Sequence, residues 1–250
     1  MKIIADTNIW YGLGQESDLF ERIKCEPIRP TFVNIHELSM SENVIDKVDL
    51  TRSAVRMLFH FKDSVIYEPP FIYLAKLQQS YDYDIIENVG IWLEFTSRFA
   101  QGETIDLSEK DNFRKETRSR KEVLIDASNF YNDEAKKIQE RIKDKKAHKK
   151  KHTLAAIGSF LSKCVEISTK GKCNLDGLKM DKVELLIKTL GHFFKILETS
   201  KMKFQPNDWY DLAILAYVQS EDKYWTREKR WLNLIKEAGC ENYLYEEKSV

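Results

Sequence analysis

The first eight residues of the chain constrain its fold more than any other stretch. A short apolar run, Ile3 to Ala5, ends at Asp6, and the polar residues Thr7 and Asn8 follow before apolar character resumes. An apolar run that stops at turn-forming residues is typical of a buried strand, and a parallel strand needs no polar alternation because both of its faces are covered. Ligands of open α/β sheets bind beyond the carboxyl ends of the strands, which is where we expect Asp6 to lie.

Strand and helix signals alternate on both sides of a long middle region. Apolar runs bounded by Pro, Gly or polar residues predict strands at 3–5, around residue 28, and at 64–68, 223–226 and 242–245. Helical periodicity is found at 7–24, 31–40, 50–61, 71–79, 83–100, 206–218 and 227–238. This alternation predicts an α/β domain with a parallel sheet of about five strands.

Residues 101–200 have no strand signal. A highly charged segment at 112–147 and more apolar ones at 154–167 and 183–197 are compatible with helices. We therefore predict a discontinuous α/β domain made of residues 1–100 and 201–250, with an all-helical insertion at 101–200.

Charge is balanced overall but not along the chain. The 250 residues include 40 Lys and Arg and 40 Asp and Glu, so the net charge gives no argument for nucleic acid or for a membrane. One run is basic, and it provides the candidate nucleic-acid-binding residues Lys136, Lys137, Arg141, Lys145, Lys146, Lys149, Lys150 and Lys151. Such a run can neutralise phosphates, although a solvated helix has the same composition.

The cysteines and the hydropathy pattern point to the cytoplasm. The four cysteines are widely spaced and form no CxxC pair, which is typical of reduced thiols in a cytosolic protein. The chain opens directly on the predicted strand rather than on a signal peptide, and no window approaches the ~18 uncharged apolar residues of a spanning helix. We expect a cytoplasmic protein that does not associate with membranes.

Several acids take positions that suggest a shared site. Glu37 lies at the edge of the apolar face of helix 31–40, and Asp208 and Asp211 are three residues apart, so they share one face of a helical turn. Glu228 closely follows the strand that ends near Thr226. Each acid alone is also typical of a helix cap, a first helical turn or a solvated surface.

The ordered set of acids resembles the PIN-domain nucleases, including the VapC-type toxins. Ile4-Ala5-Asp6-Thr7-Asn8 is similar to the opening Asp-Thr/Ser-Asn motif of that family, and Ile35-His36-Glu37-Leu38 to its second acid followed by Leu. Asp211-Leu212-Ala213-Ile214-Leu215-Ala216 resembles the Asp that opens an alanine-rich helix, and Trp225-Thr226-Arg227-Glu228 the closing Thr-x-Asp motif.

The likeness covers about residues 1–95 and 204–250 and departs from the family in three ways. Glu228 stands where Asp is usual, Asp208 is an additional acid, and the chain is much longer than a minimal PIN domain. The resemblance implies a three-layer α/β/α fold around a central parallel sheet of about five strands, here with an all-helical insertion.

The resemblance also implies hydrolysis of phosphodiester bonds in RNA with Mg²⁺ or Mn²⁺. Asp6, Glu37, Asp208, Asp211 and Glu228 would be the catalytic acids. Asp6 and Asp211 would bind the metal, Glu37 would hold a second ion or a metal-bound water, and Asp208 and Glu228 would be outer ligands. Asn8 and Thr226 would orient them by hydrogen bonds. Converging carboxylates repel one another, and hard divalent cations with oxygen ligands relieve that repulsion.

Other functions stay open at this point. The chain could be a catalytically inactive PIN-like module that binds RNA or a protein through the helical insertion, or a structure-specific DNA nuclease. The VapC likeness also implies an antitoxin protein as a partner and a homodimer.

Overall fold

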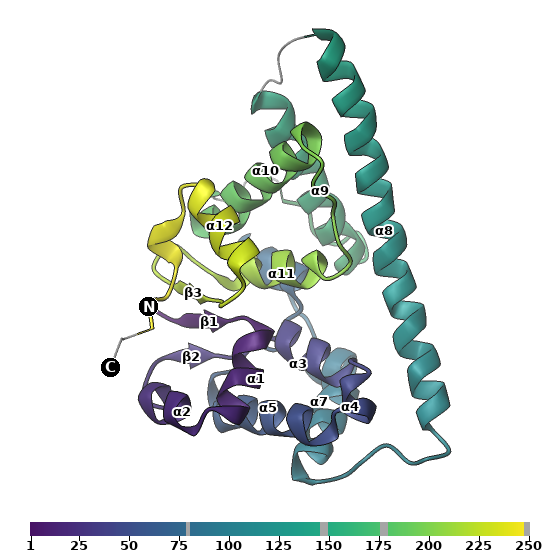
Figure 1. Cartoon of the computed structure of the whole chain (residues 1–250), viewed down its shortest axis with the longest axis vertical. Helices are drawn as coiled ribbons and strands as arrows, with labels where there is room; N and C mark the ends of the chain where they lie inside the picture. Colours follow the sequence, from purple (N-terminus) through teal and green to yellow (C-terminus); the bar gives the residue numbers. More distant parts are fainter. Residues whose placement is uncertain (79–80, 146–149, 176–179, 248–250) are drawn as a thin grey trace.

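A computed structural model describes residues 1–78, 81–145, 150–175 and 180–247 (Figure 1). Among these residues, three short strands form one parallel sheet in the order β2-β1-β3, and most of the others are helical. The strands are β1 (Ile3–Ala5), β2 (Ile28–Arg29) and β3 (Lys223–Trp225). The prediction of a three-layer fold around a sheet of about five strands is therefore wrong.

The two missing strands are reduced to single bridges. Thr31 bridges Ile66, and Tyr224 bridges Leu244, both in the parallel sense. The first bridge cannot extend because Thr31 caps the next helix and Pro69 and Pro70 interrupt the chain soon after Ile66. The second cannot extend because residues 241–243 form a 3₁₀ turn immediately before Leu244.

Strand β1 is the centre of the sheet, and both of its faces are buried. Ile3, Ile4 and Ala5 are each fully shielded from solvent. Ile4 belongs to one hydrophobic core, whereas Ile3 and Ala5 belong to another. Successive side chains of a strand point to opposite faces of the sheet. The apolar run at the start of the chain therefore contributes to a hydrophobic core on each side of the sheet.

The core that contains Ile3 and Ala5 is built by the N-terminal helices. They are α1 (Thr7–Gln15), α2 (Ser17–Ile23), α3 (Phe32–Ser39), α4 (Asn43–Asp46), α5 (Val48–His60) and α7 (Ile85–Gln101), with a 3₁₀ turn, η1 (Lys62–Ser64). Helices α1 and α5 pack so closely at Gly14 that a Cβ on this residue would lie 2.8 Å from the backbone carbon of Ser53.

The core that contains Ile4 joins the C-terminal segment to helices of the middle region. The helical elements of this half are α6 (Pro70–Gln78), α9 (Lys150–Ser168), η2 (Met180–Val183), α10 (Glu184–Thr199), α11 (Asp208–Ile214), η3 (Leu215–Tyr217), α12 (Lys229–Glu237) and η4 (Glu241–Tyr243). Phe193 of α10 stacks on Trp231 of α12, and Phe204 stacks on Trp209. Residues of α9, α10 and strand β3 belong to this one core.

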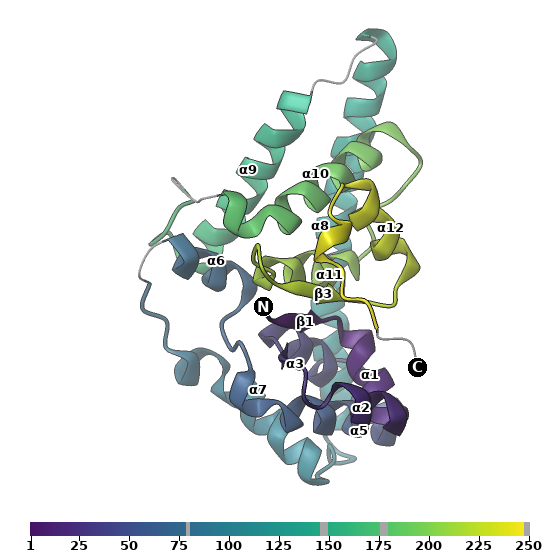
Figure 2. The ribbon, with the colours of Figure 1, turned by 90° about the vertical axis from the view of Figure 1, so that its left-hand side faces the viewer.

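Helix α8 (Lys110–Lys145) runs alongside both halves of the molecule (Figures 1 and 2). At its N-terminal end, exposed ion pairs join Arg114 to Asp46 at 2.8 Å and Arg118 to Glu42 at 3.3 Å. Further along, its Ser128 hydroxyl accepts a hydrogen bond from Trp209 Nε1 at 2.9 Å. A helix of this length spans ~54 Å, so it can reach from α4 to α10.

None of the described helices is long and apolar enough to cross a membrane. In the described part of residues 101–200, the secondary structure is helical and no strand is present.

Candidate functional site

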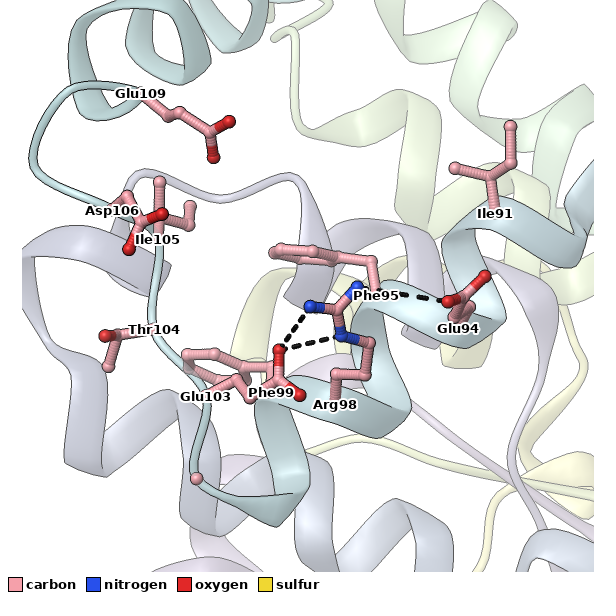
Figure 3. A pocket seen from close by; sticks show the side chains of 11 residues that line it. Ile91, Glu94, Phe95, Arg98, Phe99, Glu103, Thr104, Ile105, Asp106 and Glu109 are labelled. Carbon is pink, nitrogen blue, oxygen red and sulfur yellow. Dashed lines mark hydrogen bonds and ion pairs between the residues drawn. The ribbon is translucent and has the colours of Figure 1, made fainter.

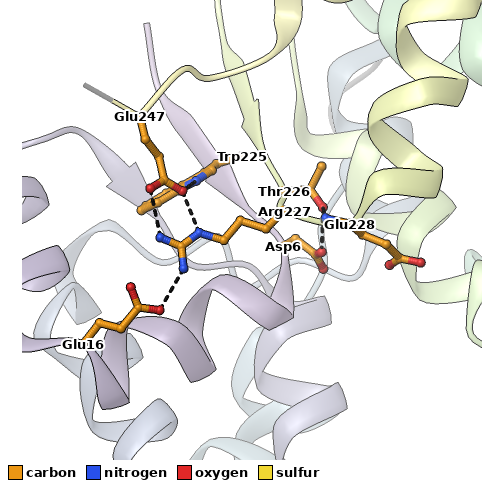
Figure 4. Close-up of polar contacts among 7 residues, drawn as sticks. All are labelled: Asp6, Glu16, Trp225, Thr226, Arg227, Glu228 and Glu247. Carbon is orange, nitrogen blue, oxygen red and sulfur yellow. Dashed lines mark hydrogen bonds and ion pairs between the residues drawn. The ribbon is translucent and has the colours of Figure 1, made fainter. Parts of the chain in front are cut away.

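Asp6 lies at the carboxyl edge of the sheet, immediately after β1. Its backbone N–H donates to the carbonyl of Trp225 at 2.8 Å, and its Oδ2 accepts from the hydroxyl of Thr226 at 2.9 Å (Figure 4). Both side chains are buried, with 4% of Asp6 and 5% of Thr226 exposed. Two parallel strands therefore end side by side, and Thr226 holds the Asp6 carboxylate there.

Two further carboxylates meet Asp6 at this edge. Asp211 comes from α11, and Glu228 comes from the turn before α12, where its N–H donates to Thr226 Oγ1 at 3.1 Å. One carboxylate oxygen from each of Asp6, Asp211 and Glu228 lies within 4.8 Å of the other two. We call these three residues the acidic cluster.

Burial disfavours the charged form of all three acids, and repulsion adds to this effect for Asp211 and Glu228. Burial raises the pKa of Asp6, although the Thr226 hydroxyl opposes the rise. Burial, followed by the charges of Asp6, Glu228 and Glu37, raises the pKa of Asp211 to about 9. Burial and then Asp6 raise the pKa of Glu228. Without a cation, the cluster cannot be fully ionised at neutral pH.

Glu37 of α3 lies beside the acidic cluster but outside the group of three. Burial raises its pKa to about 7, the Thr7 hydroxyl opposes this, and Asp6 and Glu228 add to it. Thr7 Oγ1 in turn accepts a hydrogen bond from Asn34 Nδ2 at 3.2 Å. Asn34 is fully buried and also donates to the carbonyl of Ala5 at 3.1 Å, so one amide positions Glu37 and the end of β1 together.

Neither Thr7 nor Asn34 was predicted from the sequence to have a role in the site. Thr31 and Asn34 form a capping box at the start of α3, in which the Asn34 side chain accepts from the Thr31 N–H at 2.9 Å. The Thr31-x-x-Asn34 spacing is the signal that could have indicated this cap.

Asp208 has a different environment from the cluster. Its Oδ1 and Oδ2 accept from Nη1 and Nη2 of Arg230 at 2.5 and 2.9 Å, and Oδ2 also accepts from the backbone N–H of Gln205 at 2.7 Å. Only 1% of the residue is exposed. Both oxygens are thus occupied by protein donors, and Asp208 is not one of the three grouped carboxylates. Its role as an outer ligand stays a prediction.

Two buried polar groups beside the acidic cluster are poorly paired. The Tyr224 hydroxyl and Trp231 Nε1 form no hydrogen bond of ordinary geometry with the described residues. Burial raises the pKa of Tyr224, the three acids of the cluster add to the rise, and an interaction with the Thr226 side chain opposes it. Trp231 interacts with the Asp211 carboxyl in the same way and lowers the pKa of that group. Both groups therefore have a polar neighbour inside the site, Asp211 for Trp231 and Thr226 for Tyr224, but neither bond has ordinary geometry.

The donors of the cluster fit a hard divalent cation. They are all carboxylate oxygens, which suit Mg²⁺ and Mn²⁺, and a cation would offset the repulsion that raises their pKa values. Asn8, whose backbone and side chain also lower the pKa of Asp6, is exposed on the first turn of α1.

A cavity of about 400 Å³ lies next to Glu37, between the N-terminal helices and α8. Thr7, Asn8 and Tyr11 line it from α1, and Tyr210 lines it from α11. Helix α8 closes the other side with residues that include Arg120 and Lys121. The cavity therefore combines Glu37 with positive charge, whereas Asp6, Asp211 and Glu228 do not line it.

The turn between Thr226 and Glu228 is held in place by Arg227 (Figure 4). Arg227 donates to Glu247 from Nε and Nη2 at 2.7 and 2.9 Å and to Glu16 from Nη1 at 2.8 Å. Trp225 Nε1 donates to the same Glu247 at 3.0 Å. These contacts connect the turn to Glu16, between α1 and α2, and to the C-terminal segment.

The predicted basic run lies partly outside the described residues. Lys136 and Lys137 of α8 pair with Asp133 at 3.0 Å and Glu134 at 2.6 Å, and Arg141 is exposed. Lys145 ends α8 and Lys150 and Lys151 begin α9, whereas Lys146 and Lys149 lie outside the described residues. The cavity beside Glu37 is lined by an earlier part of α8, and none of Lys136, Lys137 and Arg141, the residues of the run whose side chains are described, lines it.

A second cavity of about 580 Å³ lies between α7 and the segment that leads to α8 (Figure 3). Phe95 and Phe99 stack there, and Arg98 pairs with Glu103 at 2.7 Å. None of the site residues predicted from the sequence lines it.

No protein-family model, curated protein or solved structure matches this chain. The class of protein therefore has to be inferred from the site itself.

Proposed function

We propose that this protein is a metal-dependent ribonuclease whose acidic cluster binds Mg²⁺ or Mn²⁺. The observation that carries the proposal is the convergence of Asp6, Asp211 and Glu228 within 4.8 Å at the carboxyl edge of the parallel sheet. They come from three separate parts of the chain. A cluster of this kind raises the pKa of its own members, which is unfavourable unless a cation occupies it.

Asp6, Asp211 and Glu228 would hold the ion. When bound, Mg²⁺ or Mn²⁺ supplies positive charge at the phosphoryl oxygens and lowers the pKa of water. Thr226 keeps the Asp6 carboxylate at the edge of the sheet through its 2.9 Å hydrogen bond. Glu37, whose pKa is raised to about 7, can hold or release a proton at its carboxylate near neutral pH.

RNA is the proposed substrate because the motifs around the cluster resemble those of PIN-domain nucleases. The opening Asp6-Thr7-Asn8 and the acids Glu37, Asp211 and Glu228 supply that likeness. An antitoxin partner and a homodimer are predictions from the same likeness.

The test is cleavage of a mixed set of RNA and DNA oligonucleotides by the purified protein with Mn²⁺, with Mg²⁺ or with EDTA. We expect RNA cleavage that requires metal and is lost in Asp6→Asn, because the amide removes one charge from the cluster without changing its shape. Asp126→Asn is the matched control, since Asp126 is exposed on α8. Cleavage that persists in Asp6→Asn, or in EDTA, would contradict the proposal, and cleavage of DNA alone would change the substrate.

A further inference from the structure

The cavity beside Glu37 poses an electrostatic problem for the proposed nuclease. The acidic cluster and Glu37 repel the phosphates of a nucleic acid, so cations must hold the strand close to the acids. Glu42, which also lines the cavity, is already paired with Arg118. The cations that line the cavity are Arg120 and Lys121, both on α8.

Arg120 is held in a defined position. Its Cζ lies 4.6 Å from the ring centroid of Trp92, Nη1 lies 3.4 Å from Nε2 of His36, and Nη2 donates to Glu116 at 2.6 Å. Burial and the charge of Arg120 lower the pKa of His36 to about 4, so His36 is neutral and can accept this contact. A guanidinium placed in this way is pre-organised for a phosphate oxygen.

Arg120 is still accessible, because 35% of its side chain is exposed. Lys121 follows it directly and is exposed. On the same wall, the Thr117 hydroxyl is buried without a hydrogen-bond partner in the described residues. Tyr210, on the opposite side, is only partly buried and offers an aromatic ring to the cavity.

The dimensions of the cavity select among nucleic acids. Its volume of about 400 Å³ is in the range of small-ligand pockets. A cavity of this volume has room for about one unpaired nucleotide and not for a duplex. Unpaired bases stack on aromatic side chains such as tyrosine, while cations hold the backbone beside them.

We propose that α8 is the substrate-binding wall of this site, on which Arg120 and Lys121 bind the backbone phosphates of a single-stranded RNA whose unpaired base lies against Tyr210. This inference rests on the proposed function, because the acidic cluster is the place to which the strand is delivered. It moves phosphate binding from the basic run at 136–151 to an earlier part of the same helix.

The test is binding of a fluorescein-labelled single-stranded RNA in EDTA, measured by anisotropy at several salt concentrations. The double variant Arg120→Gln, Lys121→Gln should lose about tenfold or more in affinity. The slope of log K against log salt should also fall in magnitude by about 1.4, which corresponds to two phosphates of a single strand. Lys121→Glu alone should weaken binding as well, and it leaves the Arg120 contacts intact.

Two comparisons make the result decisive. Lys163→Gln, Lys195→Gln removes the same charge from exposed residues of α9 and α10 and should bind like wild type, whereas an equal loss there would show a non-specific charge effect and overturn the proposal. Loss in Lys136→Gln, Lys137→Gln without loss in the Arg120 and Lys121 variants would also overturn it. So would equal affinity for duplex RNA.

The two proposals can fail separately. Because binding is measured in EDTA, a protein that never cleaves RNA can still show the dependence on Arg120 and Lys121. Conversely, cleavage that requires metal and Asp6 but does not change in the Arg120 and Lys121 variants would support the nuclease proposal. It would contradict the proposal that α8 binds the RNA.

Discussion

Replacing Asp211 with asparagine should make the metal-free protein more stable at pH 8. The Asp211 carboxylate is surrounded by Asp6, Glu228 and Glu37, and its pKa is raised to about 9 by burial and by these charges. Asparagine keeps the shape of the side chain and removes the charge. We expect a gain in the free energy of unfolding of about 2 kcal/mol, measured by urea denaturation in EDTA.

The effect has a definite pH dependence. Because the folded protein holds the Asp211 proton more tightly than the unfolded chain does, ionisation of Asp211 destabilises the fold progressively as the pH rises from about 4 to about 9. The gain in Asp211→Asn should therefore be small at pH 4.5 and large at pH 8. Asp126→Asn, on the exposed face of α8, should show no such trend. A variant that is less stable than wild type at pH 8 would show that Asp211 makes favourable contacts instead.

Replacing Arg230 with methionine should have a large effect in the opposite direction. Arg230 binds both oxygens of Asp208, which is 1% exposed. Methionine keeps the apolar stem near Phe193 but leaves a buried carboxylate without its cation. We expect a loss of about 3 kcal/mol at pH 7, because breaking one side of a buried ion pair is costly.

The loss should shrink at acid pH and in a double variant. Burial raises the pKa of Asp208, and Arg230 opposes that rise, so without Arg230 the carboxyl can escape its cost by protonating as the pH falls. Arg230→Met, Asp208→Asn should recover most of the lost stability, since no charge is then left unpaired. Equal stability of Arg230→Met and wild type at pH 7, measured by thermal denaturation, would show that the ion pair does not hold α11 to α12.

The role of Asp208 illustrates what the sequence could and could not predict. Asp208 and Asp211 are three residues apart and have the same chemistry, so both were predicted to be catalytic. The structure places Asp211 in the acidic cluster and pairs Asp208 with Arg230, which is 22 residues further along the chain. Which of the two acids joins the cluster depends on how α11 lies relative to α12. No local sequence pattern determines that arrangement.

Local patterns did identify the position of Asp6. The apolar run of β1 is fully buried, and its end lies beside the end of β3, as parallel strands require. The expectation of about five strands failed because Thr31, Pro69 and Pro70 stop a strand after a single bridge. Tyr224 and Trp231 resemble ordinary core aromatics in the sequence, and only the structure places their polar atoms beside the acids.

The cavity wall on α8 could not be predicted from the sequence. Arg120 and Lys121 belong to a long helix that is rich in charged residues of both signs. Positive charge is denser at 136–151, so the nucleic-acid-binding residues were predicted there. Their position depends on how α8 passes α3 and α4, where Arg114 contacts Asp46.

Calorimetric titration of Mn²⁺ into the purified protein tests most directly whether the acidic cluster is a metal site. It needs no knowledge of the substrate. Wild type should bind Mn²⁺, Asp6→Asn should bind it at least about tenfold more weakly because one charged ligand is lost, and Asp126→Asn should match wild type. Absence of binding to wild type, or identical binding by wild type and Asp6→Asn, would contradict the assignment of Asp6, Asp211 and Glu228 as a cation site.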